Sequence, residues 1–307
     1  MEIKNSPYSK SVLLIVNPKA GRTTSKQKSE SMVKIFQKYG FKPELHITEY
    51  AGHATEIVKS MGDEFDVIAC VGGDGTLHEV INGFVQTKRK AQIGYIPAGT
   101  TNDFSKGLKL PKMPEIAVAS MAKGKVQTVD CGDFNGNKFI YVASFGAFSK
   151  VSYATPQDKK NMFGRSAYLF DGIQSVFDIR PYHARITTDD AVYEDDFIFC
   201  GTTNSYSVGG LINLPRDYVN LSDGKFELLL IRSVENPEDL PDTIHACIDF
   251  NFDHENVILT QSSTVKIELD EKTPFTLDGE FAGELDYAEI KNVNPGYDLL
   301  IPVIKEF

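Results

Sequence analysis

Three short turns combine glycine with acidic, amide or hydroxyl residues, a composition suited to binding the phosphate groups of a nucleotide. Their sequences are NPKAGR (17–22), GGDG (72–75) and PAGTTNDF (97–104). Each turn follows a short apolar run that is typical of a buried strand. Glycine lets a ligand approach the backbone closely, and the free N–H groups at a helix N-terminus attract anions. We therefore expect a phosphate-binding site where the three turns meet.

Asp74 places a negative charge inside the second turn. Mg²⁺ between this carboxylate and a phosphate would reverse the local sign of charge. Alternatively, Asp74 accepts hydrogen bonds from a ribose, or from neighbouring amides in an ordinary strand–helix turn. Thr76 and Glu79 have capping-box spacing, which predicts that Thr76 is the N-cap and that Glu79 reaches back to it. The glycines of GGDG are expected to allow positive φ.

The elements that carry these turns alternate between strand and helix. Apolar strands are predicted at 12–16, 43–50, 65–71 and 92–97, with amphipathic helices between them. This alternation predicts an α/β domain with a mostly parallel sheet and flanking helices. Ligands of such sheets bind at the carboxyl ends of the strands, where the three turns are expected to lie.

A different pattern begins at about residue 125, where short extended runs are separated by turn residues. Two helical stretches, 167–177 and 238–252, interrupt these runs. The pattern predicts a β-rich second domain, a sandwich or partly open barrel, that borders the first domain along a cleft.

Composition limits the classes of function. The chain has 307 residues, room for two domains, and a formal net charge of -10, which argues against nucleic-acid binding through general basicity. The four cysteines form no CxxC pair, which is typical of reduced thiols in a cytosolic protein. The apolar run near the N-terminus is too short to span a bilayer, so we expect a soluble, cytoplasmic protein. The chain contains no P-loop, complete dinucleotide fingerprint, HExxH, GxSxG or HRD motif.

The ordered set NPKAGR, GGDGTLHEVINGF, PAGTTNDFSKGL and, late in the chain, LDGE resembles the diacylglycerol kinase catalytic family, especially its soluble bacterial lipid kinases. The resemblance implies an α/β ATP-binding domain at 1–128, to which 298–307 returns, and a β-sandwich domain at 129–297. It places the active site in the cleft between them.

The resemblance also implies functional residues. The nucleotide positions are Asn17, Pro18, Lys19, Ala20, Gly21, Thr48, Gly73, Asp74, Gly75, Thr76, Leu77, His78, Glu79 and Thr100. The catalytic positions are Asp74, Asp103, Asp278 and Glu280, with Glu280 as proton acceptor. Asn220, Asp223 and Lys225 fall on a structural Mg²⁺ loop, where Asn220 and Lys225 would contribute backbone carbonyls.

Three positions depart from the family pattern. His78 replaces the usual Asn, Lys106 stands where Arg is common, and DGEFAGE is poorer in glycine. Lysine at 106 would contact a carboxylate as a point charge rather than as a bidentate fork. No carboxylate is lost.

Phosphoryl transfer needs positioning, Mg²⁺ and a proton acceptor, and the acids at 74, 103 and 278 could together orient the metal while Glu280 takes the proton. Asp-Gly is also the commonest hairpin signal, so both DGE and SDGK have an alternative interpretation as plain turns.

We predict an ATP- and Mg²⁺-dependent kinase that phosphorylates the hydroxyl of diacylglycerol or a related lipid to give phosphatidic acid. It would visit the inner membrane surface transiently, and bacterial relatives suggest a homodimer. Lys159, Lys160 and Arg165, beside Met162 and Phe163, could contact anionic headgroups or form an ordinary loop. A kinase acting on NAD and a catalytically silent binding module are the alternatives.

Overall fold

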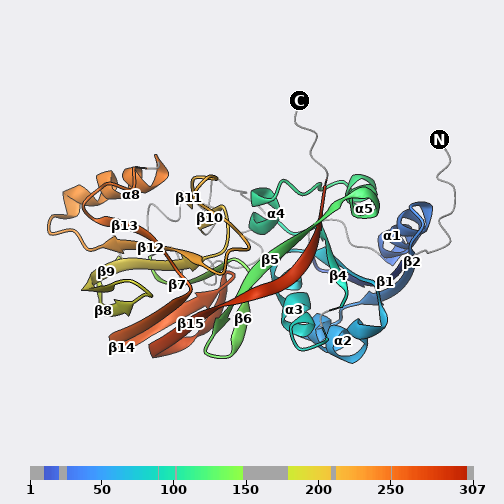
Figure 1. Cartoon of the computed structure of the whole chain (residues 1–307), viewed down its shortest axis with the longest axis horizontal. Coiled ribbons are helices and arrows are strands. Elements are labelled where there is room, and N and C mark those ends of the chain that lie inside the picture. The colour runs from blue at the N-terminus through green and yellow to red at the C-terminus, as the bar shows by residue number, and fades with distance from the viewer. Residues whose placement is uncertain are drawn as a thin grey trace. The chain divides into compact units, whose positions relative to one another are not determined.

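The computed structural model describes residues 10–20, 26–88, 90–100, 102–147, 179–208, 212–249 and 251–302. The chain divides into two compact units, Met1–Val129 with Gly296–Phe307, and Asp130–Pro295. The chain passes between the units inside two strands, β5 (Lys125–Phe134) and β15 (Glu280–Ile301) (Figure 1). The helix predicted at 167–177 and the basic–apolar segment around Met162 lie outside the described residues.

The first unit is built on a parallel sheet. Its strand order is β2 (Lys42–Ile47), β1 (Ser11–Val16), β3 (Val67–Gly72) and β4 (Gln92–Pro97). The end of β15 joins this sheet in parallel beside β4, where Leu299 pairs with Ile93. Strands β1, β3 and β4 are almost wholly buried because helices cover both faces of the sheet.

Four helices cover the sheet of the first unit. They are α1 (Lys26–Lys38), α2 (His53–Met61), α3 (Asp74–Phe84) and α5 (Pro114–Lys123), and the short turns η1 (Gly62–Glu64) and α4 (Asp103–Gly107) complete the set. Phe36 of α1 and Val118 of α5 pack with Leu14 on one face, whereas α2 and α3 lie against the other face (Figure 1). Gly40, at φ 85°, follows the end of α1, where glycine readily adopts the left-handed conformation that ends a helix.

The second unit is rich in antiparallel strands. In its sheet the order is β13 (Val257–Ser262), β12 (Phe226–Arg232), β9 (Val192–Thr203), β7 (Val142–Gly146), β14 (Thr264–Leu277) and β15. The remaining elements are β6 (Asn137–Phe139), β8 (Tyr182–Thr187), the pair β10 (Ser207–Val208) and β11 (Ile212–Asn213), η3 (Pro237–Asp239) and α8 (Leu240–Ile248). Strands β7 and β8 each pair with both β9 and β14. The predicted β-sandwich layout stays a prediction.

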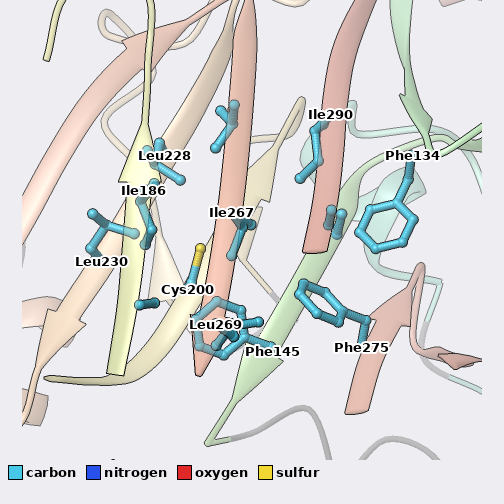
Figure 2. Close-up of a cluster of buried hydrophobic side chains, with 14 of the residues drawn as sticks. Phe134, Phe145, Ile186, Cys200, Leu228, Leu230, Ile267, Leu269, Phe275 and Ile290 are labelled. Atoms are coloured by element: carbon cyan, nitrogen blue, oxygen red, sulfur yellow. The ribbon is translucent and has the colours of Figure 1, made fainter. Parts of the chain in front are cut away.

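Aromatic side chains fill the core of the second unit (Figure 2). The ring of Phe275 lies 5.2 Å from that of Phe134 and 5.4 Å from that of Phe145, centroid to centroid. Burial of these rings, together with the aliphatic side chains of the same cluster, contributes hydrophobic stabilisation to this sheet.

All four cysteines are free and buried. Burial raises the pKa of Cys70 and Cys200 far above its usual range and raises the pKa of Cys247 to about 11. Among the described residues, no helix is both long and apolar enough to cross a membrane.

Candidate active site

The three glycine turns lie together at the carboxyl ends of adjacent parallel strands. Backbone hydrogen bonds join them, because Asn17 N donates to Val71 O at 3.0 Å and Ala98 N donates to Gly72 O at 2.7 Å. The Asn17 side chain reaches further, and its Nδ2 donates to Thr76 Oγ1 at 2.9 Å. The predicted meeting of these turns on one edge of the sheet is therefore confirmed.

Glycine is needed in these turns because backbone segments approach one another closely. A Cβ on Gly99 would lie 2.6 Å from Gly73 Cα, and one on Gly72 would lie 2.5 Å from Thr76 Cβ. Gly73 itself has φ −89°, and neither Gly72 nor Gly75 has positive φ, so the turn does not use the positive φ that glycine permits. Among the described residues, no atom that packs against Gly75 would lie within 4 Å of a Cβ there, so this side of the turn is open within that part of the chain.

The predicted capping box is also wrong. Helix α3 begins at Asp74 with Gly73 as its N-cap, three residues before the predicted N-cap Thr76. The Glu79 carboxylate contacts the neighbouring helix instead, where it accepts the N–H of Gly52 at 2.8 Å and of Ala54 at 3.1 Å. Gly52, at φ 89°, supplies no side-chain cap for α2, so a carboxylate from α3 satisfies these amides.

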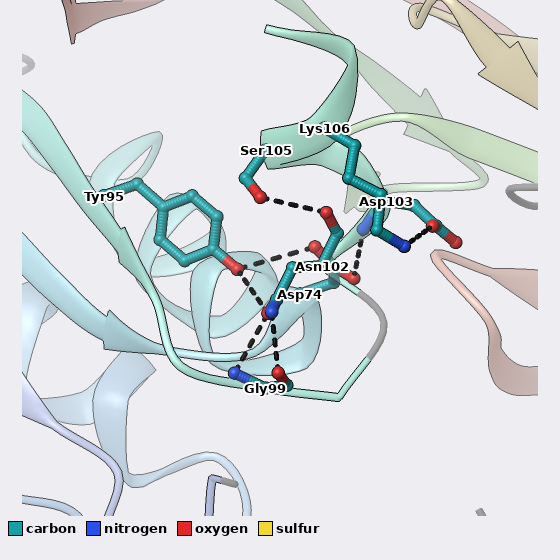
Figure 3. A network of polar contacts seen from close by, with 7 residues as sticks. All are labelled: Asp74, Tyr95, Gly99, Asn102, Asp103, Ser105 and Lys106. Carbon is teal, nitrogen blue, oxygen red and sulfur yellow. Dashed lines mark hydrogen bonds and ion pairs between the residues drawn. The ribbon is translucent and has the colours of Figure 1, made fainter. Parts of the chain in front are cut away.

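Asp74 is held by groups from the third turn (Figure 3). Its Oδ2 accepts the backbone N–H of Asp103 at 3.0 Å, and its Oδ1 lies 3.5 Å from the Tyr95 hydroxyl. The carboxylate also occupies the first turn of α3, where the helix dipole favours a negative charge. Contact with a neighbouring amide, one of the interpretations left open by the sequence, is therefore present.

Asp103 is 6% exposed, and its Oδ1 accepts a hydrogen bond from Lys106 Nζ at 2.9 Å (Figure 3). The predicted contact of Lys106 with a carboxylate is thus present within one helical turn. The two acids of this unit that were predicted to be catalytic, Asp74 and Asp103, are joined through the Asp103 backbone N–H, while the Asp103 side chain contacts the Lys106 ammonium group.

Two residues at this site carried no functional prediction. Tyr95 is 2% exposed and Asn102 is 4% exposed, and the Tyr95 hydroxyl lies 3.4 Å from Asn102 Oδ1. Burial, followed by the charge of Asp74, raises the pKa of Tyr95 well above its usual range, so the hydroxyl stays protonated as a donor. Asn102 belongs to the PAGTTNDF turn, which the sequence analysis identified as a candidate site. Tyr95 lies in the apolar run of a strand, and nothing in the sequence distinguishes it as a functional residue.

The remaining nucleotide positions of the first unit surround these turns. Lys19 is exposed, and its backbone N–H donates a hydrogen bond to Asn17 Oδ1 at 2.9 Å. Thr48 is buried just after β2, and its backbone N–H donates to Val16 O at 3.0 Å. Thr100 is exposed. Gly21 lies outside the described residues.

In the second unit, DGE forms the tight hairpin between β14 and β15. Asp278 and Gly279 have φ of 50° and 85°, the left-handed pair of a type I′ turn. The Asp278 carboxylate accepts three backbone N–H groups, from Ile140 at 2.8 Å, Tyr141 at 2.9 Å and Val142 at 3.1 Å.

These contacts separate the two acids of DGE. Asp278 is 5% exposed and its oxygens face amides of its own unit, which favours a role in fixing the turn over metal binding. Glu280, two residues on, is exposed and pairs through its backbone with Leu277. The turn interpretation is thus right for the backbone, and Glu280 is the carboxylate that the turn presents to solvent.

The predicted Mg²⁺ loop packs on a buried carboxylate. Gly224 N donates to Asp130 Oδ2 at 2.8 Å, whereas Asp130 Oδ1 is buried with no hydrogen-bond partner among the residues that the structure describes. Burial raises the pKa of Asp130. Asp223 Oδ1 accepts the N–H of Lys225 at 3.0 Å, and Asn220 Oδ1 accepts that of Ser222 at 3.2 Å. Among the described residues, no group of three or more His, Cys, Asp or Glu could hold a metal ion.

Comparison with known proteins identifies the same family that the sequence motifs resemble. A family model described as the diacylglycerol kinase catalytic domain matches residues 11–134. A diacylglycerol kinase from Bacillus subtilis (strain 168) is 32% identical over 274 residues, which cover 89% of this chain and 90% of the relative. A diacylglycerol kinase from Staphylococcus carnosus (strain TM300) is 31% identical over 275 residues, covering 89% of each chain.

Solved structures share the fold. The crystal structure of a diacylglycerol kinase from Bacillus anthracis str. Sterne aligns with a TM-score of 0.75 at 22% identity, covering 97% of this chain and 99% of that chain. A second crystal structure from the same organism aligns with a TM-score of 0.81 at 24% identity, covering 96% and 97%.

Proposed function

The chain belongs to the diacylglycerol kinase family and is a lipid kinase, and we propose that it transfers the γ-phosphate of ATP to the hydroxyl of diacylglycerol or a related lipid, with Mg²⁺, to give phosphatidic acid. The observation that carries this proposal is the meeting of three glycine turns around Asp74 at one edge of the parallel sheet.

The first unit would bind the nucleotide. Backbone N–H groups at the start of α3, together with the open side of Gly75, suit the close approach of phosphate oxygens. Bound Mg²⁺ would neutralise charge on the phosphate groups. Asp74 is the carboxylate best placed to orient the metal ion, because two contacts hold it in one orientation. The Asp103 N–H donates to Oδ2, and the buried Tyr95 hydroxyl lies beside Oδ1.

The second unit would supply the proton acceptor. As the lipid hydroxyl oxygen attacks the γ-phosphorus, its proton passes to Glu280, and the bond from the γ-phosphorus to the β–γ bridging oxygen breaks to release ADP. An exposed carboxylate on a rigid type I′ turn fits this role. That Asp74 and Glu280 face one another across an interdomain cleft remains part of the proposal.

The loop Asn220–Lys225 fits a structural Mg²⁺ ion in donor chemistry. It offers the Asp223 carboxylate and backbone carbonyls, and it packs beside the unpaired buried oxygen of Asp130. Mg²⁺ prefers such oxygen donors. A homodimer and a transient contact with the inner membrane surface complete the proposal, since the lipid substrate resides in a bilayer.

A lipid-panel assay tests the proposal. Purified protein with MgATP and dispersed diacylglycerol should form labelled phosphatidic acid, and EDTA should abolish the product. Asp74→Asn and Glu280→Gln should each lower kcat at least 100-fold while leaving the unfolding midpoint within a few degrees.

Two further measurements distinguish the lipid kinase from an NAD kinase and from a binding module without activity. Phosphorylation of NAD in place of lipid would establish the NAD kinase alternative. Full lipid kinase activity in both variants would overturn the residue roles, and ATP binding without transfer to any lipid or to NAD would favour a binding module.

A further inference from the structure

Asn102 adopts a backbone conformation that is uncommon for a residue with a side chain. It has φ 50° and ψ 51°, in the left-handed region, immediately before α4. Asparagine tolerates this region better than most residues, but a buried left-handed residue persists only where its surroundings hold it. Asn102 is 4% exposed.

The side chain of Asn102 closes the third turn. Its Oδ1 accepts the N–H of Gly99 at 2.9 Å, and its Nδ2 donates to Gly99 O at 2.6 Å (Figure 3). It makes no capping bond to its own helix. The backbone carbonyl of Asn102 accepts hydrogen bonds from Ser105 Oγ at 2.9 Å and Lys106 N at 3.2 Å. Asn102 is therefore held by the preceding turn through its side chain and by α4 through its carbonyl.

This conformation directs two groups toward Asp74. The peptide that follows Asn102 carries the Asp103 N–H, which lies 3.0 Å from Asp74 Oδ2. The Tyr95 hydroxyl lies 3.4 Å from Asn102 Oδ1 and 3.5 Å from Asp74 Oδ1. A hydroxyl has one proton, so the amide and the carboxylate share a single donor at this position.

We propose that Asn102 is a positioning residue for the phosphoryl-transfer site: its left-handed turn, locked to Gly99, sets the orientation of the Asp74 carboxylate through the Asp103 N–H. This inference rests on the proposed function, because it assumes that Asp74 orients Mg²⁺ and ATP. Asn102 itself need not touch either ligand.

The substitutions Asn102→Gly and Asn102→Ala separate the two parts of this role. Glycine keeps the left-handed conformation and loses the bonds to Gly99, whereas alanine loses both. The proposal predicts that the Mg²⁺ concentration for half-maximal activity, and the Kd for ATP with Mg²⁺, rise about tenfold in N102G and further in N102A. The Kd for ATP in EDTA should change less than threefold in both variants.

Asn135 provides a matched control. It is another non-glycine residue with positive φ, at 49°, it lies exposed in the turn between β5 and β6, and its Oδ1 accepts the N–H of Glu289 at 2.8 Å. Asn135→Gly should alter the unfolding midpoint at most and leave the Mg²⁺ dependence at the wild-type value.

The outcomes are separable. If N102A fails to fold, N102G decides, since its backbone preference is intact. Unchanged Mg²⁺ dependence in folded N102G, or equal shifts in N102G and N135G, would overturn the inference even if the wild type phosphorylates lipid. If the wild type transfers no phosphate, the proposed function fails, whereas calorimetric binding of ATP with and without Mg²⁺ still tests the role of Asn102.

Discussion

The carboxylate of Glu79, in α3, accepts the backbone N–H of Ala54, in α2, at 3.1 Å. One side chain thereby joins the helix that begins at the glycine turn to the N-terminus of the neighbouring helix.

Glu79→Gln should lower the free energy of unfolding by about 1 kcal/mol, because it removes one carboxylate oxygen and a negative charge from the N-terminus of α2. Urea unfolding measures this change. Glu115, an exposed acid in the first turn of α5, provides the control, and Glu115→Gln should change stability by less than about 0.5 kcal/mol. If Glu79 instead binds nucleotide, the Kd for ATP will change and stability will not.

Gly75 and Gly99 should respond oppositely to alanine. Gly99→Ala places a methyl 2.6 Å from Gly73 Cα and 2.8 Å from Asn102 Oδ1, so we expect a loss of about 2 kcal/mol or more in stability. Gly75→Ala meets no atom within 4 Å in the part of the chain that the structure describes and adds a better helix former to α3, so it should raise stability by up to about 1 kcal/mol. If phosphate approaches this open side, G75A should nevertheless raise the Kd for ATP at least tenfold. Thermal unfolding and calorimetry on the two proteins measure both quantities, and a destabilised G75A would contradict the described turn.

Asp278→Asn should destabilise the second unit. Asparagine accepts the left-handed backbone, but its amide NH₂ would face N–H donors where the carboxylate accepted three of them. We expect a loss of about 2–3 kcal/mol and a lower kcat with unchanged Mg²⁺ dependence. A shift in Mg²⁺ dependence without loss of stability would identify Asp278 as a metal ligand instead.

Tyr95 should make stability sensitive to alkaline pH. Its pKa is raised in the folded state by burial and by Asp74, so its contribution is fully present below the pKa of an unfolded tyrosine, about 10. Above that value the unfolded chain ionises while the folded chain does not, and the contribution is lost as pH rises. Tyr95→Phe removes this group, so the difference in unfolding free energy between wild type and Y95F should be constant from about pH 7 to 9.5 and shrink above pH 10. A constant difference throughout would contradict the assignment.

Local patterns predicted much of the first unit. Short apolar runs bounded by glycine and proline became β1, β3 and β4, and the three turns met because the carboxyl ends of parallel strands share one edge. The capping-box prediction was wrong because the motif considers only partners within the same helix. The Glu79 carboxylate instead accepts backbone N–H groups at the N-terminus of α2. Tyr95 was missed for a related reason, since nothing local distinguishes a strand tyrosine whose hydroxyl lies beside a carboxylate from one that merely packs.

The predicted catalytic role of DGE cannot be inferred from the turn sequence alone. The same Asp-Gly-Glu sequence is compatible with a plain type I′ hairpin and with a hairpin that carries a proton acceptor, and only the surroundings of the two acids distinguish these possibilities. The Asp278 carboxylate accepts the backbone N–H groups of residues 140–142, which lie more than 130 positions away in the chain. Glu280 is exposed instead. Such pairings depend on tertiary structure.

The last strand of the parallel sheet comes from residues that are synthesised after the whole second unit. Leu299, which is fully buried, pairs with Ile93 of β4, and Leu300 belongs to the same core as Leu14. A fragment that stops at Val129 would therefore leave β4 without this neighbour and expose part of that core to water. On the ribosome, the first unit can therefore complete its folding only after the second unit has been synthesised.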